Sequence, residues 1–71
     1  MGMRILSTMM MMTYKTEFGQ VEVASSGEGM YLITLPPYGH EIYVVAFTPE
    51  SAVGKACEFW YHKRNLILEK I

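Results

Sequence analysis

The sequence has little of what disulfide, metal or membrane chemistry requires. Cys57 is the only cysteine among 71 residues, so no disulfide can form within the chain. A lone cysteine is typical of a reducing compartment, which predicts a cytoplasmic location. One Cys and two separated His residues fit no structural zinc pattern, so we expect no metal and no cofactor. No apolar run is long enough to span a bilayer, so no membrane association is expected.

Charged residues are also scarce. Six Lys and Arg against seven Asp and Glu give a net charge of −1, and charged residues make up 18% of the chain. Nucleic-acid binding draws on clustered cations that displace counterions from phosphate. The densest basic cluster is the pair Lys63 and Arg64, with Lys55 and Lys70 nearby. Nucleic-acid binding is therefore weakly supported, and a DNA-mimicking acidic surface is not predicted.

Apolar residues, by contrast, are abundant for so small a chain. They make up 51% of the sequence, with seven Met and five Tyr among them. Both residue types are adaptable or amphipathic and are enriched at interfaces. A domain of this size buries only about 60% of the surface that its unfolded chain exposes, and it commonly needs a disulfide, a metal or a partner. Association with another protein is the option that the composition leaves.

The chain divides into a Met-rich start and one small domain. Residues 1–12 are expected to form an arm or an edge strand, and residues 13–71 a single β-β-β-α domain. Apolar and polar residues alternate over 14–24 with a change of phase at Gly19, which predicts either a strand with a bulge or two strands with a tight turn. Further strands are predicted over 30–35 and 41–47.

The start of a helix is the sharpest local signal. Thr48 can cap the helix, Pro49 suits its first position, and Glu50 suits the positive end of the dipole. Phe47 and Ala52 have the spacing of a hydrophobic staple. One helical face is then formed by apolar residues at the expected spacing, namely Val53, Ala56, Cys57 and Trp60.

The predicted fold class is α+β. Three or four antiparallel strands are followed by one helix that packs on one face of the sheet. Asn65 is expected to end the helix, and residues 66–71 then form a last strand or a further helical turn.

Both faces of the predicted strands are apolar. In the third strand, alternate residues give two sets, namely Ile42, Val44 and Ala46 against Tyr43, Val45 and Phe47. In the second strand the sets are Met30 and Leu32 against Tyr31, Ile33 and Leu35. One helix covers one face, so the other needs the amino-terminal arm, the carboxyl-terminal tail or another molecule. We expect a homodimer or a protein partner.

No catalytic machinery is recognisable. His40 and Glu41 lack the second His, four positions on, that a helical zinc-protease motif requires. Cys57 lies on the predicted core face of the helix, where a thiol behaves as a small hydrophobe. Cys57 and His62 are five residues apart and lie on different helix faces, so the helix does not pair them as nucleophile and base. We therefore expect no enzymatic activity and no catalytic residues.

The stretch from Ile42 to Ala52, a strand followed by a threonine cap and an alanine-containing helix, resembles two families with a three-strand-plus-helix layout. One is the plant ethylene-response-factor DNA-binding domain with the related arm-binding domain of phage integrases, and the other is the HicB-like antitoxins. The first resemblance implies DNA reading by Arg, Lys and Trp on the strands, whereas the matching strands here carry Met30, Tyr31, Ile33, Ile42 and Tyr43. The second implies a dimer.

The sequence thus predicts a non-enzymatic protein-interaction module that binds a partner or itself through an apolar aromatic sheet face. By analogy it is an accessory or inhibitory protein of a mobile element. The predicted contacts are Tyr31, Tyr38, His40 and Tyr43. The alternative is a small nucleic-acid-binding domain that uses the basic helix end, namely Lys55, Tyr61, Lys63 and Arg64. A third possibility is a dimer that captures a small ligand between its protomers.

Overall fold

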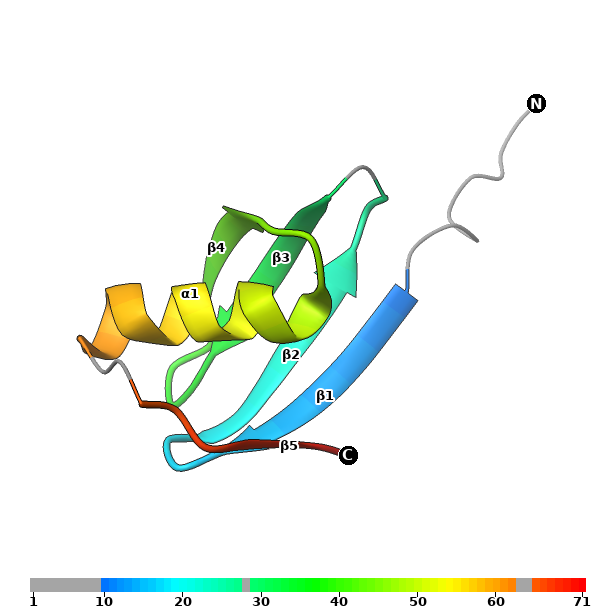
Figure 1. The fold of residues 1–71 in the computed structure, drawn as a ribbon. Coiled ribbons are helices and arrows are strands. Elements are labelled where there is room, and N and C mark those ends of the chain that lie inside the picture. The colour runs from blue at the N-terminus through cyan, green and yellow to red at the C-terminus, as the bar shows by residue number, and fades with distance from the viewer. Residues whose placement is uncertain (1–9, 28, 63–64) are drawn as a thin grey trace.

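A computed structural model describes residues 10–27, 29–62 and 65–71 of the chain. Its elements, in chain order, are β1 (Met10–Thr16), β2 (Gly19–Ser25), β3 (Met30–Leu35), β4 (His40–Val45), α1 (Pro49–Tyr61) and β5 (Leu68–Lys70). The strands form one antiparallel sheet in the order β4-β3-β2-β1-β5, and α1 lies across one face of it (Figure 1). The predicted α+β class is confirmed, with five strands among the described residues rather than the three or four expected.

The alternation over residues 14–24 belongs to two strands joined by a tight turn. Thr16 pairs with Gly19 at the end of the β1–β2 hairpin. The Thr16 hydroxyl donates to the Gly19 carbonyl at 2.8 Å and accepts from the Phe18 N–H at 3.0 Å, so one side chain closes the turn. The bulged-strand alternative is wrong. The strand already begins at Met10, and the remainder of the predicted arm, residues 1–9, lies outside the described residues.

The helix begins where its local chemistry predicts. The Thr48 side chain accepts a hydrogen bond from the Ser51 N–H at 3.1 Å, and Pro49 occupies the first turn. The predicted staple between Phe47 and Ala52 is wrong, because Phe47 is fully exposed while Ala52 is buried. Phe47 continues the alternation of β4 on the side that faces away from the helix, so the buried residue before the cap is Ala46.

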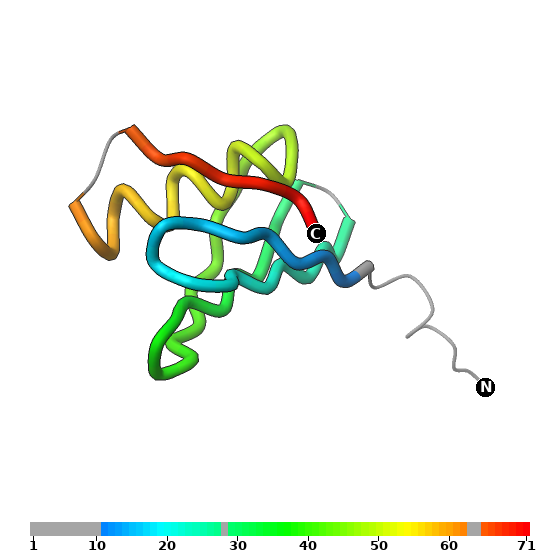
Figure 2. Tube along the Cα trace, turned by 90° about the horizontal axis from the view of Figure 1, so that it is seen from below, coloured from blue at the N-terminus to red at the C-terminus, as the bar shows by residue number. Residues whose placement is uncertain are grey.

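The chain returns to the sheet after a helix that is shorter than predicted. The helix ends at Tyr61, and its cap His62 has a left-handed φ of 58°. The segment that follows runs back beside β1, where Leu68 pairs with Thr16 and the Ile71 N–H donates to the Thr13 carbonyl at 2.9 Å. Of the two predictions for residues 66–71, the strand is correct. Figure 2 shows this tail at the edge of the sheet, next to β1.

The core lies between α1 and the helix-facing side of the sheet. Its members come from four of the elements, namely Tyr14, Val21, Val23, Tyr31, Ile33, Leu35, Ala52, Val53, Ala56 and Cys57, with Ala46 at its margin. Burial of one large aliphatic or aromatic side chain contributes about 1.5–3 kcal/mol. Trp60 is only partly buried, so the predicted helix face is a core face except at its carboxyl end.

Candidate partner-binding surface

Strand β4 is an outer strand of the sheet, and its free side is open. The Ala46 N–H donates to the Gly29 carbonyl at 2.9 Å, next to the β3–β4 ladder. Because hydrogen-bonded and free positions alternate along an antiparallel strand, the backbone groups of residues 42 and 44 face β3, and those of residues 41, 43 and 45 face outward. In the described part of the chain, the outward groups of Glu41 and Tyr43 have no hydrogen-bond partner.

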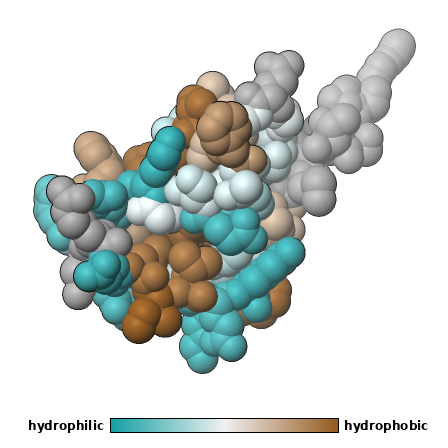
Figure 3. Space-filling model, in the orientation of Figure 1, coloured by the Kyte–Doolittle hydropathy of each residue, from teal (hydrophilic) through white to brown (hydrophobic). Residues whose placement is uncertain are grey.

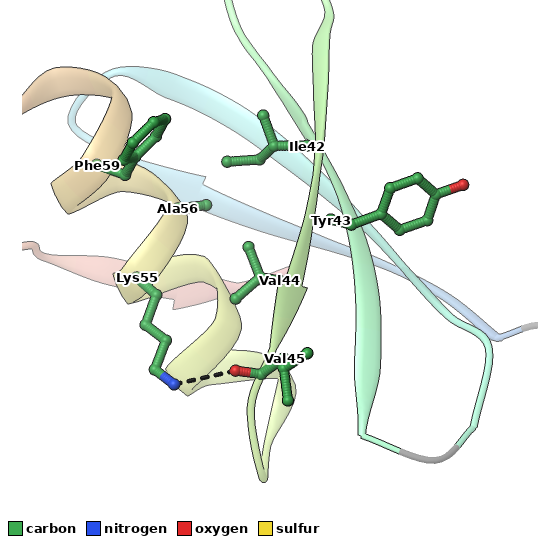
Figure 4. A pocket seen from close by; sticks show the side chains of 7 residues that line it. All are labelled: Ile42, Tyr43, Val44, Val45, Lys55, Ala56 and Phe59. Carbon is green, nitrogen blue, oxygen red and sulfur yellow. Dashed lines mark hydrogen bonds between the residues drawn. The ribbon is translucent and has the colours of Figure 1, made fainter.

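One outward carbonyl of β4 is already occupied. The Lys55 Nζ on α1 donates to the Val45 carbonyl at 2.9 Å (Figure 4). The contact confirms that the backbone carbonyl of Val45 points away from β3. It also places an ammonium group at one end of the exposed edge, whereas Glu41 places a carboxylate near the other end. By the strand register, the Glu41 side chain lies on the sheet face away from α1, so the two charges lie on opposite sides of the sheet.

A hollow of about 350 Å³ lies between β4 and α1, and we call it the edge groove. It is lined by Ile42, Tyr43, Val44, Val45, Lys55, Ala56 and Phe59. Ile42 and Val44 point from the strand towards the helix, and Tyr43 points to the opposite side (Figure 4). Ala56 is too small to fill the space above Ile42 and Val44. Phe59, which is 70% exposed, stands at one end of the groove.

A second hollow of about 240 Å³ adjoins the edge groove. It is lined by Gly29, Val45, Ala46, Phe47 and Lys55, so the two hollows share Val45 and Lys55. Gly29 has a φ of +75°, a conformation that favours glycine. A Cβ at this position would also lie 3.3 Å from the Ala46 carbonyl oxygen, so both the backbone conformation and the close contact disfavour a side chain. The hollows extend the apolar surface along β4 to the fully exposed Phe47.

The sheet face opposite α1 carries a second apolar surface, which we call the open-face patch. It consists of Met11, Ala24, Met30, Leu32, Tyr43 and Val45, which lie on this face by the pairing of the strands. Tyr43 is 70% exposed and Val45 65% exposed. The other end of the same face is polar, with Thr13, Lys15, Gln20, Glu22, Thr34 and Glu41. The carboxyl-terminal tail lies at the sheet edge, so it does not provide the cover considered for this face.

The tyrosines predicted to form one aromatic sheet face do not share a face. Tyr31 pairs with Val44 and Tyr43 pairs with Leu32, so the two tyrosines lie on opposite faces of the sheet. Tyr31 is only 8% exposed because α1 covers its side of β3. Its assignment as a partner contact is therefore wrong, whereas Tyr43 is accessible.

Tyr38 and His40 belong to a separate aromatic group at the β3–β4 turn. The His40 ring lies 4.4 Å from the Trp60 ring and 6.2 Å from the Tyr38 ring, the latter in an edge-on arrangement. Tyr38 and His40 are both exposed. They lie at the end of β4 away from Val45, on the helix side, so the structure does not bring them together with Tyr43.

Of the four residues of the nucleic-acid alternative, Lys55 and Tyr61 make contacts within the chain. Lys55 donates to the Val45 carbonyl. The Tyr61 ring stacks on Phe18 with 3.8 Å between centroids, and the Tyr61 hydroxyl donates to the Pro36 carbonyl. Burial raises the pKa of Tyr61, as expected of a packed side chain. Lys63 and Arg64 lie outside the described residues.

Burial raises the pKa of two groups in the core. Burial raises the pKa of the Cys57 thiol to about 11, so it carries little thiolate at neutral pH. Burial, aided by a hydrogen bond to Glu50, raises the pKa of Tyr14 to about 12. No group of three or more His, Cys, Asp and Glu side chains that could hold a metal ion occurs among the described residues.

Phe59 and Phe47 are the exposed apolar residues that sequence reasoning missed as contacts. Phe59 follows Ala56 by three positions, so both lie on the side of α1 that overhangs β4. That spacing is a usable signal, but the apolar spacing of the predicted core face selects the neighbouring Trp60 instead. Figure 3 shows hydrophobic surface near the β4–α1 connection and again between α1 and β5, where Ile67 is exposed.

A scan against protein-family models finds no match, and searches of curated proteins and of solved structures find none either. Among the described residues, α1 is too short to cross a membrane.

Proposed function

We propose that this chain is a non-enzymatic protein-interaction module that binds a protein partner or a second copy of itself through β4. The observation that carries the proposal is an outer strand with free backbone groups and exposed apolar side chains on both of its sides. Tyr43 and Val45 are exposed on the open face, and Phe59 is exposed beside the edge groove. The interaction surface consists of the β4 edge, the edge groove and the open-face patch.

An added strand suits this edge for two reasons. Its backbone would satisfy the outward N–H and C=O groups of Glu41 and Tyr43, which is how strand addition contributes affinity. Its side chains would alternate between the edge groove and the open face, and that alternation provides specificity. Aromatic side chains such as Tyr43 and Phe59 are enriched among residues that dominate binding energy.

The sequence of β4 supports the same proposal. Exposed edge strands are usually protected against pairing by lysine, proline or a bulge. The six residues of β4 contain no lysine and no proline, and their ladder with β3 is continuous. Lys55 shields one carbonyl from the side of the helix and leaves the middle of the strand open.

Site-specific photo-cross-linking tests the proposal. A photoreactive phenylalanine analogue replaces Tyr43 in the full chain, expressed in native-host cells, and nuclease is added after irradiation. We expect a discrete covalent adduct to a protein, either another copy of the chain or a second species, because residue 43 lies at the centre of the surface.

The matched control carries the same analogue at Lys15, which is also exposed on the open face but lies at its polar end. The adduct should be absent or much weaker there. A folded protein that gives no protein adduct from position 43, or equal adducts from both positions, contradicts the proposal. Loss of the adduct on nuclease treatment favours the nucleic-acid alternative instead.

A further inference from the structure

We infer that the occupant of the β4 edge is an extended segment of another protein, in which two apolar residues stand between a basic and an acidic residue. The inference rests on the proposed function and names the chemistry of the partner for the same surface. Any strand can pair with the free backbone groups of β4, so the backbone does not choose between partners. The side chains beside the edge do choose, because they place one charge and one apolar surface on each face of the sheet.

Lys55 sets the point at which pairing with the added strand ends. Its Nζ donates to the Val45 carbonyl at 2.9 Å, so that carbonyl is occupied. The outward groups of Glu41 and Tyr43 have no hydrogen-bond partner in the described part of the chain, so an added backbone bonds at these two residues. The residue opposite Val44 comes next, and its side chain points to the α1 side of the sheet, where the Lys55 ammonium lies (Figure 4).

On the α1 side, the added segment meets an apolar surface followed by a positive charge. The residue opposite Ile42 lies beside the edge groove, next to Ala56 and the 70% exposed Phe59, so an apolar side chain suits this position. The residue opposite Val44 lies next to Lys55, so an aspartate or glutamate there gains a charge-assisted hydrogen bond. The ammonium group has three donors, so it can bind this carboxylate and keep its backbone acceptor.

On the open face, a negative charge is followed by an apolar surface. The residue opposite Glu41 faces a carboxylate, so a lysine or arginine suits it. The residue opposite Tyr43 faces a ring that is 70% exposed, so an apolar or aromatic side chain suits it. Along the added segment the order is therefore basic, apolar, apolar, acidic, or its reverse, according to the direction of the strand. The basic and acidic side chains then point to opposite faces of the sheet.

A second copy of this chain does not supply that order. Among the described residues, no strand has two apolar residues between a basic and an acidic residue. A second β4 that pairs with the first at Tyr43 would place Ile42 opposite Val44, so it would bring no carboxylate to Lys55. The charges beside the edge therefore favour a different protein over a second copy.

Selection from a phage-displayed library of random peptides on the full chain tests the inference. Selected peptides should be enriched, relative to the unselected library, in the order basic, apolar, apolar, acidic or its reverse. Lys55→Gln keeps an N–H donor for the Val45 carbonyl but removes the charge, so selection on it should lose the acidic preference and keep the apolar one. Lys15→Gln, the matched control, removes an exposed lysine at the polar end of the open face and should select the same peptides as the wild type.

A charge swap tests the contact with Lys55. By isothermal titration calorimetry, a synthetic peptide of the selected sequence should bind Lys55→Glu roughly three- to tenfold more weakly than it binds the wild type. A peptide with lysine in place of its acidic residue should recover that loss. A library that yields no binder of the folded protein, or equal acidic preferences on the wild type and Lys55→Gln, overturns the inference. A position-43 adduct with the mass of two chains also overturns it, but would still support the proposed function.

Discussion

The Tyr14 hydroxyl of β1 lies at the start of the helix. It donates to Glu50 Oε2 at 2.9 Å, and Tyr14 is otherwise fully buried. The pKa of Glu50 is lowered, first by its backbone N–H at the helix start, then by this hydroxyl, with a smaller effect of Lys70. The hydrogen bond thus joins β1 to the first turn of α1 across the edge of the core.

Glu50→Gln should therefore destabilise the fold at neutral pH and not at acidic pH. A carboxyl whose pKa is lowered by folding stabilises the protein above its ordinary pKa, and this contribution is lost as the pH falls through the lowered value. Chemical denaturation of the wild type and the variant should give curves that differ at pH 7 and converge below the lowered pKa. Glu22→Gln, an exposed glutamate on the opposite face, is the control. A difference that persists unchanged at low pH contradicts this assignment.

Single residues also show where sequence reasoning reaches its limit. The alternation of β3 and β4 correctly predicts which side chains share a face. It does not say which face the helix covers, because both sets are apolar. Tyr31 and Tyr43 have similar neighbours in sequence, yet one is in the core and the other is exposed. The direction in which the chain leaves β4 towards α1 decides between them.

At the scale of elements, the amino-terminal cap of α1 can be tested by substituting a single residue. Thr48 accepts the Ser51 N–H, which would otherwise lack a partner in the first turn. Thr48→Ala should lower the free energy of unfolding by about 0.5–2 kcal/mol. Thr48→Ser, which keeps the acceptor, should lose much less. Urea denaturation with unchanged m-values measures both, and equal losses from the two variants would exclude the cap as the cause.

The two ends of α1 differ in how well they could be predicted. Its start depends on Thr48 and Pro49, which act within one turn, and the prediction is correct. Its end depends on His62, whose left-handed conformation turns the chain back before Asn65. Strand β5 depends on β1, more than 50 residues earlier in the chain, so its three residues gave no sequence pattern that separated strand from helix.

At the scale of the whole molecule, the two outer strands of the sheet differ in length. The β5 edge is only three residues long, whereas β4 offers six. The sequence predicts an uncovered apolar face and predicts Tyr43 as one of its contacts. It does not predict that this face and the edge groove meet along one strand. That meeting depends on the order β4-β3-β2-β1-β5, which places the third predicted strand at the outside.

If β4 is covered by a second copy, stability must depend on protein concentration. A dimer stabilises its folded chains by mass action, since the unfolded chain does not bind. Well above the dissociation constant, each tenfold increase in concentration should stabilise each chain by roughly 0.7 kcal/mol, half of the usual 1.4 because two chains share one association. For a domain of this size that corresponds to an increase of a few °C in Tm.

Thermal unfolding across two decades of concentration measures this dependence. Tyr43→Lys, a change at a side chain that is 70% exposed in the single chain, should melt lower than the wild type at high concentration, and the two should converge as the wild type is diluted. The convergence of the two Tm values is informative, because a substitution that only destabilises the monomer lowers Tm at every concentration. A wild-type Tm that does not change with concentration means that the chain unfolds as a monomer over that range, and that β4 is reserved for a different partner.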